Sequence, residues 1–378
     1  MQNLRGEGIH SREALGFAVA LSYACVAATR DVYLGGLVQR VSPSAVALVA
    51  FGASTSILLP IALARRRDSL AILWRQRRLL LWVNITSAVG WLAFLGSLRL
   101  IEPCLVQILY FGVGPLSVVS IDRYLSRAAP GVPLTRAERP IFIGLLISLV
   151  FASVVAVNGL SGMETQPVGN SMLGVILAIA GGVAMSVSIL QCRRLNDAGI
   201  GPGVMFSVRY PMTALAAGIL AFMSPAGILD TAPWISVIMA IAVLLILVPS
   251  YINQFAISLA SPLTVRVVMA GAPVIVLLLE AIEGRLSPSL YSLVAAVFYG
   301  VFAISAGLAR QRAIQMTEIN GTNRNLEPSS HRQPLSTSHD WSDTQVERPN
   351  VIPVSEADRG RDPAEIPGIS NWRRNYPL

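Results

Sequence analysis

The sequence GAPVIVLLLEAIEGRLSP, residues 271–288, joins a Gly-Ala-Pro break to a long apolar run that ends in two glutamates and an arginine. A related sequence motif, GPLSVVSIDRYL, occurs earlier at residues 114–125, again with glycine and proline, an apolar run and then an acid. A sequence motif that recurs at long spacing indicates an internal repeat, in which each copy is one structural unit. These two stretches therefore predict a chain built from two related halves.

The composition is that of a membrane protein. Of the 378 residues, 53% are hydrophobic and 13% are charged, and the mean hydropathy is +0.60. An ordinary soluble domain carries about 25% charged residues. All 29 basic residues are arginine, which excludes chemistry that needs a lysine, such as a phosphate-loop lysine or a Schiff base. The chain is therefore expected to lie mostly in lipid and not to be an ATP-driven pump by itself.

Ten stretches are apolar and close to the length of about 20 residues that a membrane-spanning helix requires. They fall near residues 14–37, 44–64, 79–98, 104–121, 141–159, 172–191, 204–223, 234–252, 263–282 and 290–308. The predicted fold class is an all-α membrane protein with ten transmembrane helices.

Arginine is concentrated in every second segment between these stretches, most densely in RRRDSLAILWRQRR at residues 65–78. The alternate segments hold little beyond Arg40, Arg99 and Arg285. Because arginine is enriched in cytoplasmic loops, we expect both termini in the cytoplasm. The exclusive use of arginine suggests a GC-rich genome, so the expected location is a bacterial inner (plasma) membrane.

One alternative concerns the N-terminus. Arg5 and Arg12, followed by ALGFAVALSYACVAA, resemble a secretory signal, whose cleavage would leave nine helices. At the other end, residues 313–378 are rich in proline, serine, asparagine and mixed charge and have no apolar period. Such a segment buries too little apolar surface to fold, so it is expected to be a disordered cytoplasmic tail.

The ten stretches divide into two sets of five. Pro43 opens the second predicted helix and Pro202 opens the seventh, while the acids Asp122 and Glu280 follow the prolines of the fourth and ninth at the same offset. Because five is odd, the second copy enters the membrane from the opposite side, and inverted repeats of this kind are typical of secondary transporters. The predicted organisation is a cytoplasmic N-terminus at 1–13, a first repeat at 14–159, an outer linker at 160–171, a second repeat at 172–312 and the tail at 313–378.

With five-plus-five stretches and GAPVIVLLLEAIEGRLSP at the ninth, the chain resembles the drug/metabolite transporter superfamily, specifically its EamA-type ten-helix members. Those members carry a proline within the fourth and ninth helices, then an apolar run, a Gly-Glu-Arg-like end and a short turn. Here the ninth stretch ends in Glu283-Gly284-Arg285, with glycine and glutamate transposed, and the fourth is followed by the insert LSRAAPGVPLTRAERP. The resemblance covers roughly residues 14–312. It implies export of a small molecule, since the family exports amino acids, metabolites, nucleotide-linked sugars and drugs.

Ionisable residues within membrane helices are costly and mark functional sites. Arg209, beside Tyr210 in the seventh stretch, is a candidate for binding an anionic substrate group such as a carboxylate, and its counterpart in the first repeat is Ala50. The alternative is a side chain that extends to the inner membrane surface.

Three further ionisable residues are candidates for the substrate pathway. Arg30 and Asp31 lie late in the first stretch, where Asp31 is a candidate proton or cation site. The alternative is a pair at the outer surface that ends a shortened helix. Consecutive helical residues point in different directions, so the two are not expected to neutralise each other. Glu280 is a candidate for gating the outer mouth together with Glu283 and Arg285, against the alternative of a turn motif at the membrane surface.

Neutral candidates combine aromatic walls with hydrogen-bonding groups, as small-molecule cavities do. They are Trp91, Gln107, Tyr110, Asn253 and Gln254. Pro115 and Pro273 each remove a backbone hydrogen bond, so we expect them to kink their helices and to supply bends for alternating access.

These observations favour a secondary transporter that exports a small polar or amphipathic metabolite by alternating access between the two repeats. The expected partners are the lipid bilayer, the substrate and a proton or another coupling ion, with no nucleic acid, in a monomer or homodimer. No cofactor or metal is expected, because the three histidines lie outside the apolar stretches and the cysteines lack metal-ligand spacing. The alternatives are a non-transporting membrane subunit or receptor, and a membrane-embedded enzyme, for which no catalytic constellation is visible.

Overall fold

The structure, a computed structural model, describes residues 3–65, 67–125, 136, 138–164, 166–223, 240, 243–259, 268–287 and 289–326, some of them by their backbone alone. Every regular element in these ranges is a helix. Residues Met1–Arg324 form one compact unit. The second unit, Asn325–Leu378, lies outside the described residues except for its first two.

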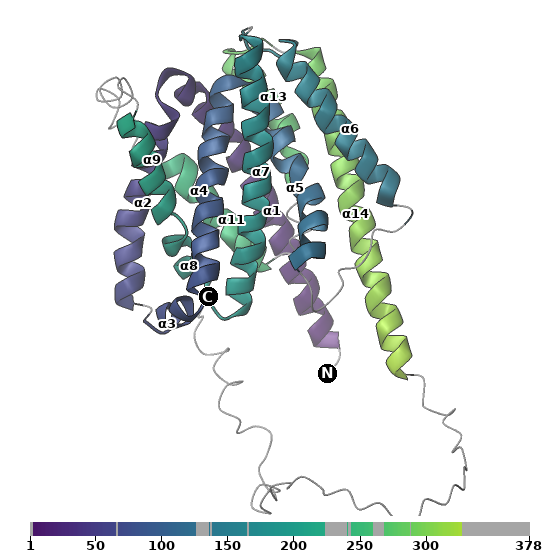
Figure 1. The fold of residues 1–378 in the computed structure, drawn as a ribbon. Helices are drawn as coiled ribbons and strands as arrows, with labels where there is room; N and C mark the ends of the chain where they lie inside the picture. Colours follow the sequence, from purple (N-terminus) through teal and green to yellow (C-terminus); the bar gives the residue numbers. More distant parts are fainter. Residues whose placement is uncertain are drawn as a thin grey trace, which may run out of the picture. The chain divides into compact units, whose positions relative to one another are not determined.

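The described helices follow one another along the chain in the order shown in Figure 1. Their bounds are α1 Asn3–Arg40, α2 Pro43–Arg65, α3 Arg67–Arg75, α4 Arg77–Leu100, α5 Pro103–Leu125, α6 Glu138–Val157, α7 Val168–Asp197, α8 Pro202–Val208, α9 Pro211–Met223, the π-helix η2 Val243–Leu247, α11 Val248–Leu259, α13 Ala272–Glu283 and α14 Leu290–Leu326. Proline begins α2, α5, α8 and α9, because its missing N–H would be unpaired at a first helical position in any case. The predicted helix starts at Pro43 and Pro202 are therefore confirmed.

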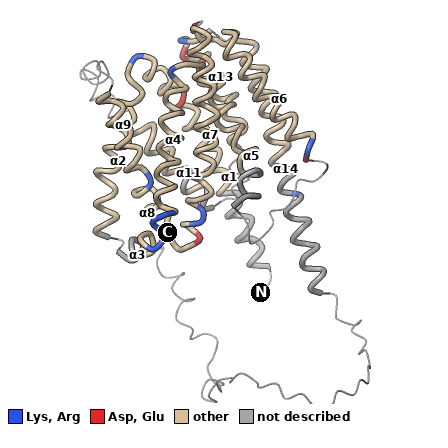
Figure 2. Tube along the Cα trace, viewed as in Figure 1, with Lys and Arg blue, Asp and Glu red and all other residues tan. Residues whose placement is uncertain are grey.

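Seven helical segments are long and apolar enough to cross a membrane. They are Leu15–Arg40, Pro43–Ala64, Arg77–Leu100, Glu138–Val157, Val168–Asp197, Pro202–Met223 and Leu290–Ala309. Large apolar side chains such as Ile57, Ile143 and Leu220 are exposed on these helices, as expected of surfaces that face lipid. Charged residues gather toward the ends of the helices (Figure 2). By the length and composition of its helices, the chain is an all-helical, multi-pass membrane protein.

Three predicted spans do not meet that criterion over the described residues. The fourth lies in α5, whose apolar part is the shorter segment Pro103–Ser117. The eighth and ninth, predicted at 234–252 and 263–282, fall partly on residues 234–239, 241–242 and 263–267, which lie outside the described residues. Their described parts are η2 with α11, and α13.

Two boundaries differ from those predicted. The seventh span is interrupted, because α8 ends at Val208 and α9 begins at Pro211. Proline has no N–H to donate and disfavours the helical conformation in the residue before it, so the Arg-Tyr-Pro sequence breaks the helix. At the other end, α14 continues beyond Arg312 to Leu326, so residues 313–326 of the predicted tail are helical. The remainder of the tail lies outside the described residues.

The interior is formed by a set of helix pairs. The most extensive packing is between α4 and α7; α5 also packs on α7, α2 packs on α9, and α1 packs on α11 and α13. The start of α1 and the C-terminal half of α14 lie at the same end of the helix bundle (Figure 1). One apolar core joins these helices, and it includes Phe51, Phe94, Leu105 and Tyr210.

Glycine allows α5 and α7 to approach closely. A Cβ at Gly182 of α7 would lie 2.3 Å from the carbonyl oxygen of Tyr110 and 2.5 Å from a methyl group of Val113. At Gly169 of the same helix, a Cβ would meet no atom within 4 Å. The α5–α7 contact therefore depends on the missing side chain at Gly182.

We expect Gly182→Ala to lower the thermal stability of the purified protein, because the Tyr110 backbone cannot move without displacing α5. Overpacking of this kind costs about 1–3 kcal/mol. Gly169→Ala is the matched control, and its melting temperature should equal or slightly exceed that of the wild type, since alanine is the better helix former. The measurement is the apparent melting temperature in detergent. Equal melting temperatures for the two variants would contradict the close α5–α7 contact.

Candidate functional site

Most of the candidate residues predicted from the sequence lie together in the interior of the helix bundle. Arg30 and Arg209 are each 3% exposed. Tyr23 and Tyr110 are both close enough to the two arginines to interact electrostatically with each. We define the central cluster as Tyr23, Arg30, Asp31, Phe51, Trp91, Phe94, Gln107, Tyr110, Phe206, Arg209 and Tyr210.

The first charged part of the central cluster is an ion pair on α1. The Nε of Arg30 donates to Oδ1 of Asp31 over 2.5 Å, and the amide nitrogen of Gln107 donates to the other Asp31 oxygen. The expectation that these neighbours do not neutralise each other is therefore wrong. Both side chains are buried in an apolar interior, where an unpaired charge is expensive, so the arginine turns back onto the carboxylate.

Aromatic rings contact the same arginine. The Arg30 guanidinium lies 5.3 Å from the ring centre of Trp91 and 5.6 Å from that of Phe94, within the range of a cation–π interaction. Because α1 continues to Arg40, the pair does not end a shortened helix, as the alternative interpretation held. It is part of the interior.

The second charged part is Arg209, at the break between α8 and α9. Its Nε donates to the hydroxyl of Ser87 over 2.9 Å, and one terminal nitrogen donates to the hydroxyl of Ser188 over 3.1 Å and approaches the sulfur of Met185 at 2.9 Å. Ser87 and Ser188 also bond each other over 2.7 Å across the α4–α7 contact. The side chain thus points inward between two helices and does not extend to the surface.

No carboxylate lies within 4.0 Å of Arg209 among the residues that the structure describes. A buried cation held only by hydroxyls, sulfur and the ring of Tyr210, 5.6 Å away, has no counter-charge of its own. Together, Arg30, Asp31 and Arg209 carry a net charge of +1. The central cluster is therefore electrostatically suited to an anionic group.

Aromatic side chains connect the two charged parts. Ring centres lie 5.2 Å apart for Phe51 and Trp91, 5.0 Å for Phe51 and Tyr210, and 4.8 Å for Phe94 and Tyr110. Such contacts give the site flat apolar walls. Phe51 and Phe94 were not among the candidates, because phenylalanine in an apolar stretch gives no sequence signal that separates a wall from a core.

Two buried polar atoms of the central cluster have no hydrogen-bond partner among the residues that the structure describes. They are the indole nitrogen of Trp91, a donor, and the side-chain oxygen of Gln107, an acceptor. Buried polar groups are normally paired, so these atoms are available to a ligand. The central cluster can therefore offer a cation, a donor, an acceptor and aromatic surface.

The other predicted candidates lie elsewhere. Glu280 is buried on α13 and its Oε1 accepts a hydrogen bond from the backbone of Cys104, so it is not a turn residue at the surface. Asn253 is half-buried on α11, and the side chain of Gln254 lies outside the described residues. Pro115 lies inside α5, whereas Pro273 occupies the first turn of α13, directly after a turn at Ala270 and Gly271.

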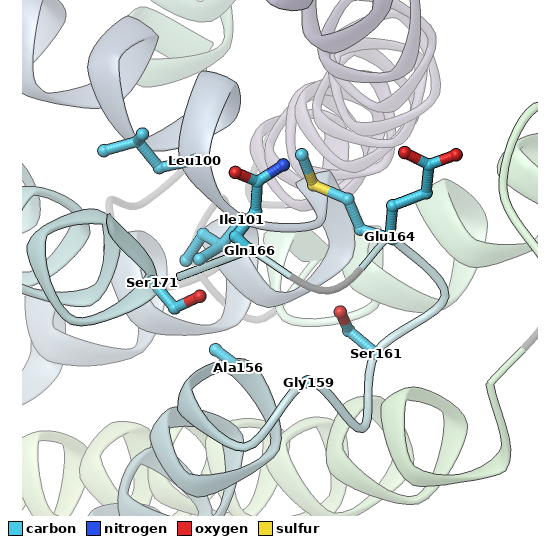
Figure 3. A pocket seen from close by; sticks show the side chains of 9 residues that line it. Leu100, Ile101, Ala156, Gly159, Ser161, Glu164, Gln166 and Ser171 are labelled. Carbon is cyan, nitrogen blue, oxygen red and sulfur yellow. The ribbon is translucent and has the colours of Figure 1, made fainter. Parts of the chain in front are cut away.

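One small pocket lies away from the central cluster, at the connection between α6 and α7 (Figure 3). Its accessible volume of about 10 Å³ corresponds to about one water molecule. Residues Leu100, Ile101, Ala156, Gly159, Ser161, Met163, Glu164, Gln166 and Ser171 line it. This pocket is too small for a metabolite.

Comparison with known proteins indicates the fold alone. No protein-family model matches the chain, and no curated protein matches it. A solved structure described only as "Crystal structure of protein" aligns with a TM-score of 0.50 at 20% sequence identity, over 80% of this chain and 98% of that one. The fold and the site thus define a class, the all-helical multi-pass membrane proteins, here with a cationic and aromatic interior.

Proposed function

We propose that this chain is a secondary transporter for a small amphipathic metabolite that carries a carboxylate or a similar anionic group. The observation that carries the proposal is Arg209, buried at a helix break and without a carboxylate partner among the described residues. Burial of a charge without compensation costs several kcal/mol. A substrate anion that binds there would supply the missing counter-charge.

The position of Arg209 also favours transport. Substrate sites of secondary transporters typically lie where a membrane helix is interrupted, because the interruption leaves polar groups facing the interior of the bundle. Here the break falls within Pro202–Met223. The unpaired atoms of Trp91 and Gln107 and the aromatic rings nearby suit a ligand with hydrogen-bonding groups and a flat apolar part.

The pattern of helix contacts supports the inverted repeat. In the proposed ten-helix arrangement, α1 corresponds to α7, α2 to α8–α9, α4 to η2–α11, α5 to α13 and α6 to α14. The packing of α4 on α7 then has its counterpart in α11 on α1, that of α5 on α7 in α13 on α1, and that of α4 on α9 in η2 on α2. The two-fold operation exchanges α2 with α9 and α5 with α13, so the contacts within these two pairs are their own counterparts. A pseudo-two-fold axis in the membrane plane would produce these pairs.

The resemblance to EamA-type transporters agrees with this arrangement, and we propose membership in that family. The start of α1 and the C-terminal half of α14 lie at one end of the bundle, which supports placing both on one side of the membrane. From the arginine distribution we propose that this is the cytoplasmic side of a bacterial inner membrane.

The test begins with the metabolites in the medium of cells that overexpress the chain and of cells that lack it. Metabolites that differ are then offered, radiolabelled, to proteoliposomes that contain the purified full-length protein under imposed pH and voltage gradients. We expect uptake or exchange of at least one carboxylate-bearing metabolite, compared with protein-free vesicles. Identical media together with vesicles that exchange none of the common amino and carboxylic acids would contradict the proposed function.

A further inference from the structure

A second buried acidic site lies outside the central cluster. Glu102, in the connection between α4 and α5, is 1% exposed, and Glu280 of α13 is 2% exposed. Oε2 of Glu102 accepts hydrogen bonds from the backbone N–H of Gly162 over 2.9 Å and from the hydroxyl of Ser292 over 2.7 Å. Oε1 of Glu280 accepts from the backbone N–H of Cys104 over 3.3 Å. The two carboxyls therefore join four separate parts of the chain.

The two carboxyl groups lie close to each other, and no donor between them is found among the described residues. Oε2 of Glu280 is buried and has no hydrogen-bond partner in the described part of the chain, although the carboxyl of Glu102 lies within hydrogen-bonding reach of Glu280. Two ionised carboxylates can only accept hydrogen bonds, so they cannot satisfy each other. One proton on either group turns this repulsive contact into an O–H···O hydrogen bond.

No basic group of the described residues neutralises the pair. Arg285 lies nearby, but its Nε pairs with Oε2 of Glu283 over 3.4 Å. Its terminal nitrogens donate to the side chain of Gln39 over 2.5 Å and to the carbonyl of Val32 over 3.4 Å. The other charged or titratable groups that act on the pair are Glu283 and the thiol of Cys104, which is buried and approaches the carbonyl of Pro273. From α14 and from the α6–α7 connection, the described groups that face the pair are the neutral Ser292 and Gly162.

We propose that Glu102 and Glu280 form a proton-binding site, in which one shared proton fastens α13 to the α4–α5 connection at this end of the bundle. Two neighbouring carboxyl groups that are both buried cannot both ionise without a large penalty. Burial raises the pKa of the Glu102 carboxyl above its usual range, although the hydrogen bonds from Ser292 and Gly162 oppose the increase.

The shared proton affects the connections that meet at this end of the helix bundle, namely the α4–α5 and α6–α7 connections and the turn between α13 and α14. The α6–α7 connection also contacts the turn between α13 and α14, since Ser287 and Ser289 donate to the carbonyls of Gly162 and Leu160. Loss of the proton sets two buried negative charges against each other and pushes α13 away from these connections. In the transporter proposed above, opening of this end would then depend on pH. That consequence rests on the proposed function, whereas the bound proton does not.

Infrared spectroscopy of the purified full-length protein tests the proton directly, because the carbonyl stretch of a protonated carboxyl is separate from the stretches of a carboxylate. We expect the wild type to show a protonated-carboxyl band at neutral pH that survives in Glu283→Gln, a matched carboxyl one turn along α13. The band should be lost in the double variant Glu102→Gln/Glu280→Gln. Glutamine can keep the existing hydrogen bonds, so these variants should fold. A wild-type band that persists unchanged in the double variant, or no band at all, would overturn the proposal.

Thermal stability provides the second test. The folded protein retains a proton on the Glu102 carboxyl at pH values where the unfolded chain releases it, above about 4.3. The contribution of the proton to stability is therefore complete below that pH and is lost as the pH rises toward the raised pKa of the folded state. We expect the melting temperature of the wild type to fall over this range more steeply than that of Glu280→Gln. Parallel pH profiles for the two proteins would count against the shared proton. Neither readout requires a substrate, so failure of the transport assay leaves both tests valid.

Discussion

Replacement of Arg209 with alanine should lower substrate transport at least tenfold and leave the protein as stable as the wild type or more so. The two effects differ because Arg209 is buried without a carboxylate partner in the described part of the chain. Removal of an uncompensated buried charge relieves a desolvation penalty. Ser87 and Ser188 keep the hydrogen bond to each other when the arginine is gone. A residue that lowers stability while it serves a ligand is typical of functional sites.

The size of the transport defect follows from the lost contact. A hydrogen bond to a charged group contributes about 1.5–3 kcal/mol, and 1.4 kcal/mol corresponds to about a tenfold change in affinity. We therefore expect at least a tenfold loss of uptake in proteoliposomes at low substrate concentration. Arg209→Lys should recover only part of the activity, because lysine keeps the charge but lacks the planar fork.

The matched control is Arg99→Ala, an exposed arginine in the last turn of α4. It should change neither uptake nor melting temperature. If Arg209→Ala transports normally, Arg209 does not bind the substrate. If the variant instead melts several degrees lower than the wild type, the arginine has a structural role, and the proposed site loses its main support.

Asp31→Ala should lower the stability of the protein, unlike Arg209→Ala, and reduce the yield of folded protein. Asp31 accepts hydrogen bonds from both Arg30 and Gln107, and its removal leaves a buried guanidinium without a counter-charge. Breaking a buried ion pair by removal of one partner costs about 3–5 kcal/mol. Arg209 tolerates the lack of a carboxylate because two hydroxyls and a sulfur accept its hydrogen bonds, whereas the other groups that contact Arg30 in the described part of the chain are aromatic rings.

The double variant Arg30→Ala/Asp31→Ala tests whether the loss of stability comes from the broken ion pair. Removal of both charges avoids an unpaired ion, so the double variant should regain much of the stability that Asp31→Ala loses. The measurement is a double-mutant cycle of apparent melting temperatures, with the yield of monodisperse protein as a second readout. Glu283→Ala, which removes a carboxylate that is more exposed, is the control. A cycle in which the two single effects simply add would show that Arg30 and Asp31 do not depend on each other.

The helical class and most of the spans could be predicted from the sequence, because the length of an apolar run sets whether a helix can cross a membrane. The helix starts at Pro43 and Pro202 could also be predicted, since proline at a first helical position is a local property. The break after Val208 was missed, although Pro211 gives a local signal for it. Arg30, Asp31, Trp91, Gln107, Tyr110, Arg209 and Tyr210 were named in advance because polar or large aromatic groups are unusual within apolar runs.

The partners of these residues could not be predicted. Ser87 and Ser188 lie on helices about one hundred residues apart and contact Arg209 only because α4 packs on α7. Glu102 stands in a connection between helices, where an acid in sequence looks like an ordinary solvent-exposed residue. Its burial beside Glu280 depends on the packing of α13, α14 and the α6–α7 connection around it.

The sequence alone determined that this protein is helical and multi-pass, because the transfer of apolar side chains and of satisfied backbone into lipid depends on local composition. It also determined which residues would be costly to bury. Only the tertiary structure decided which of them are paired. Among the described residues, Arg30 is paired with a carboxylate, Arg209 is not, and two glutamates distant in sequence lie next to each other. Charge compensation depends on distances of a few ångströms between atoms that the chain brings together only when its helices pack.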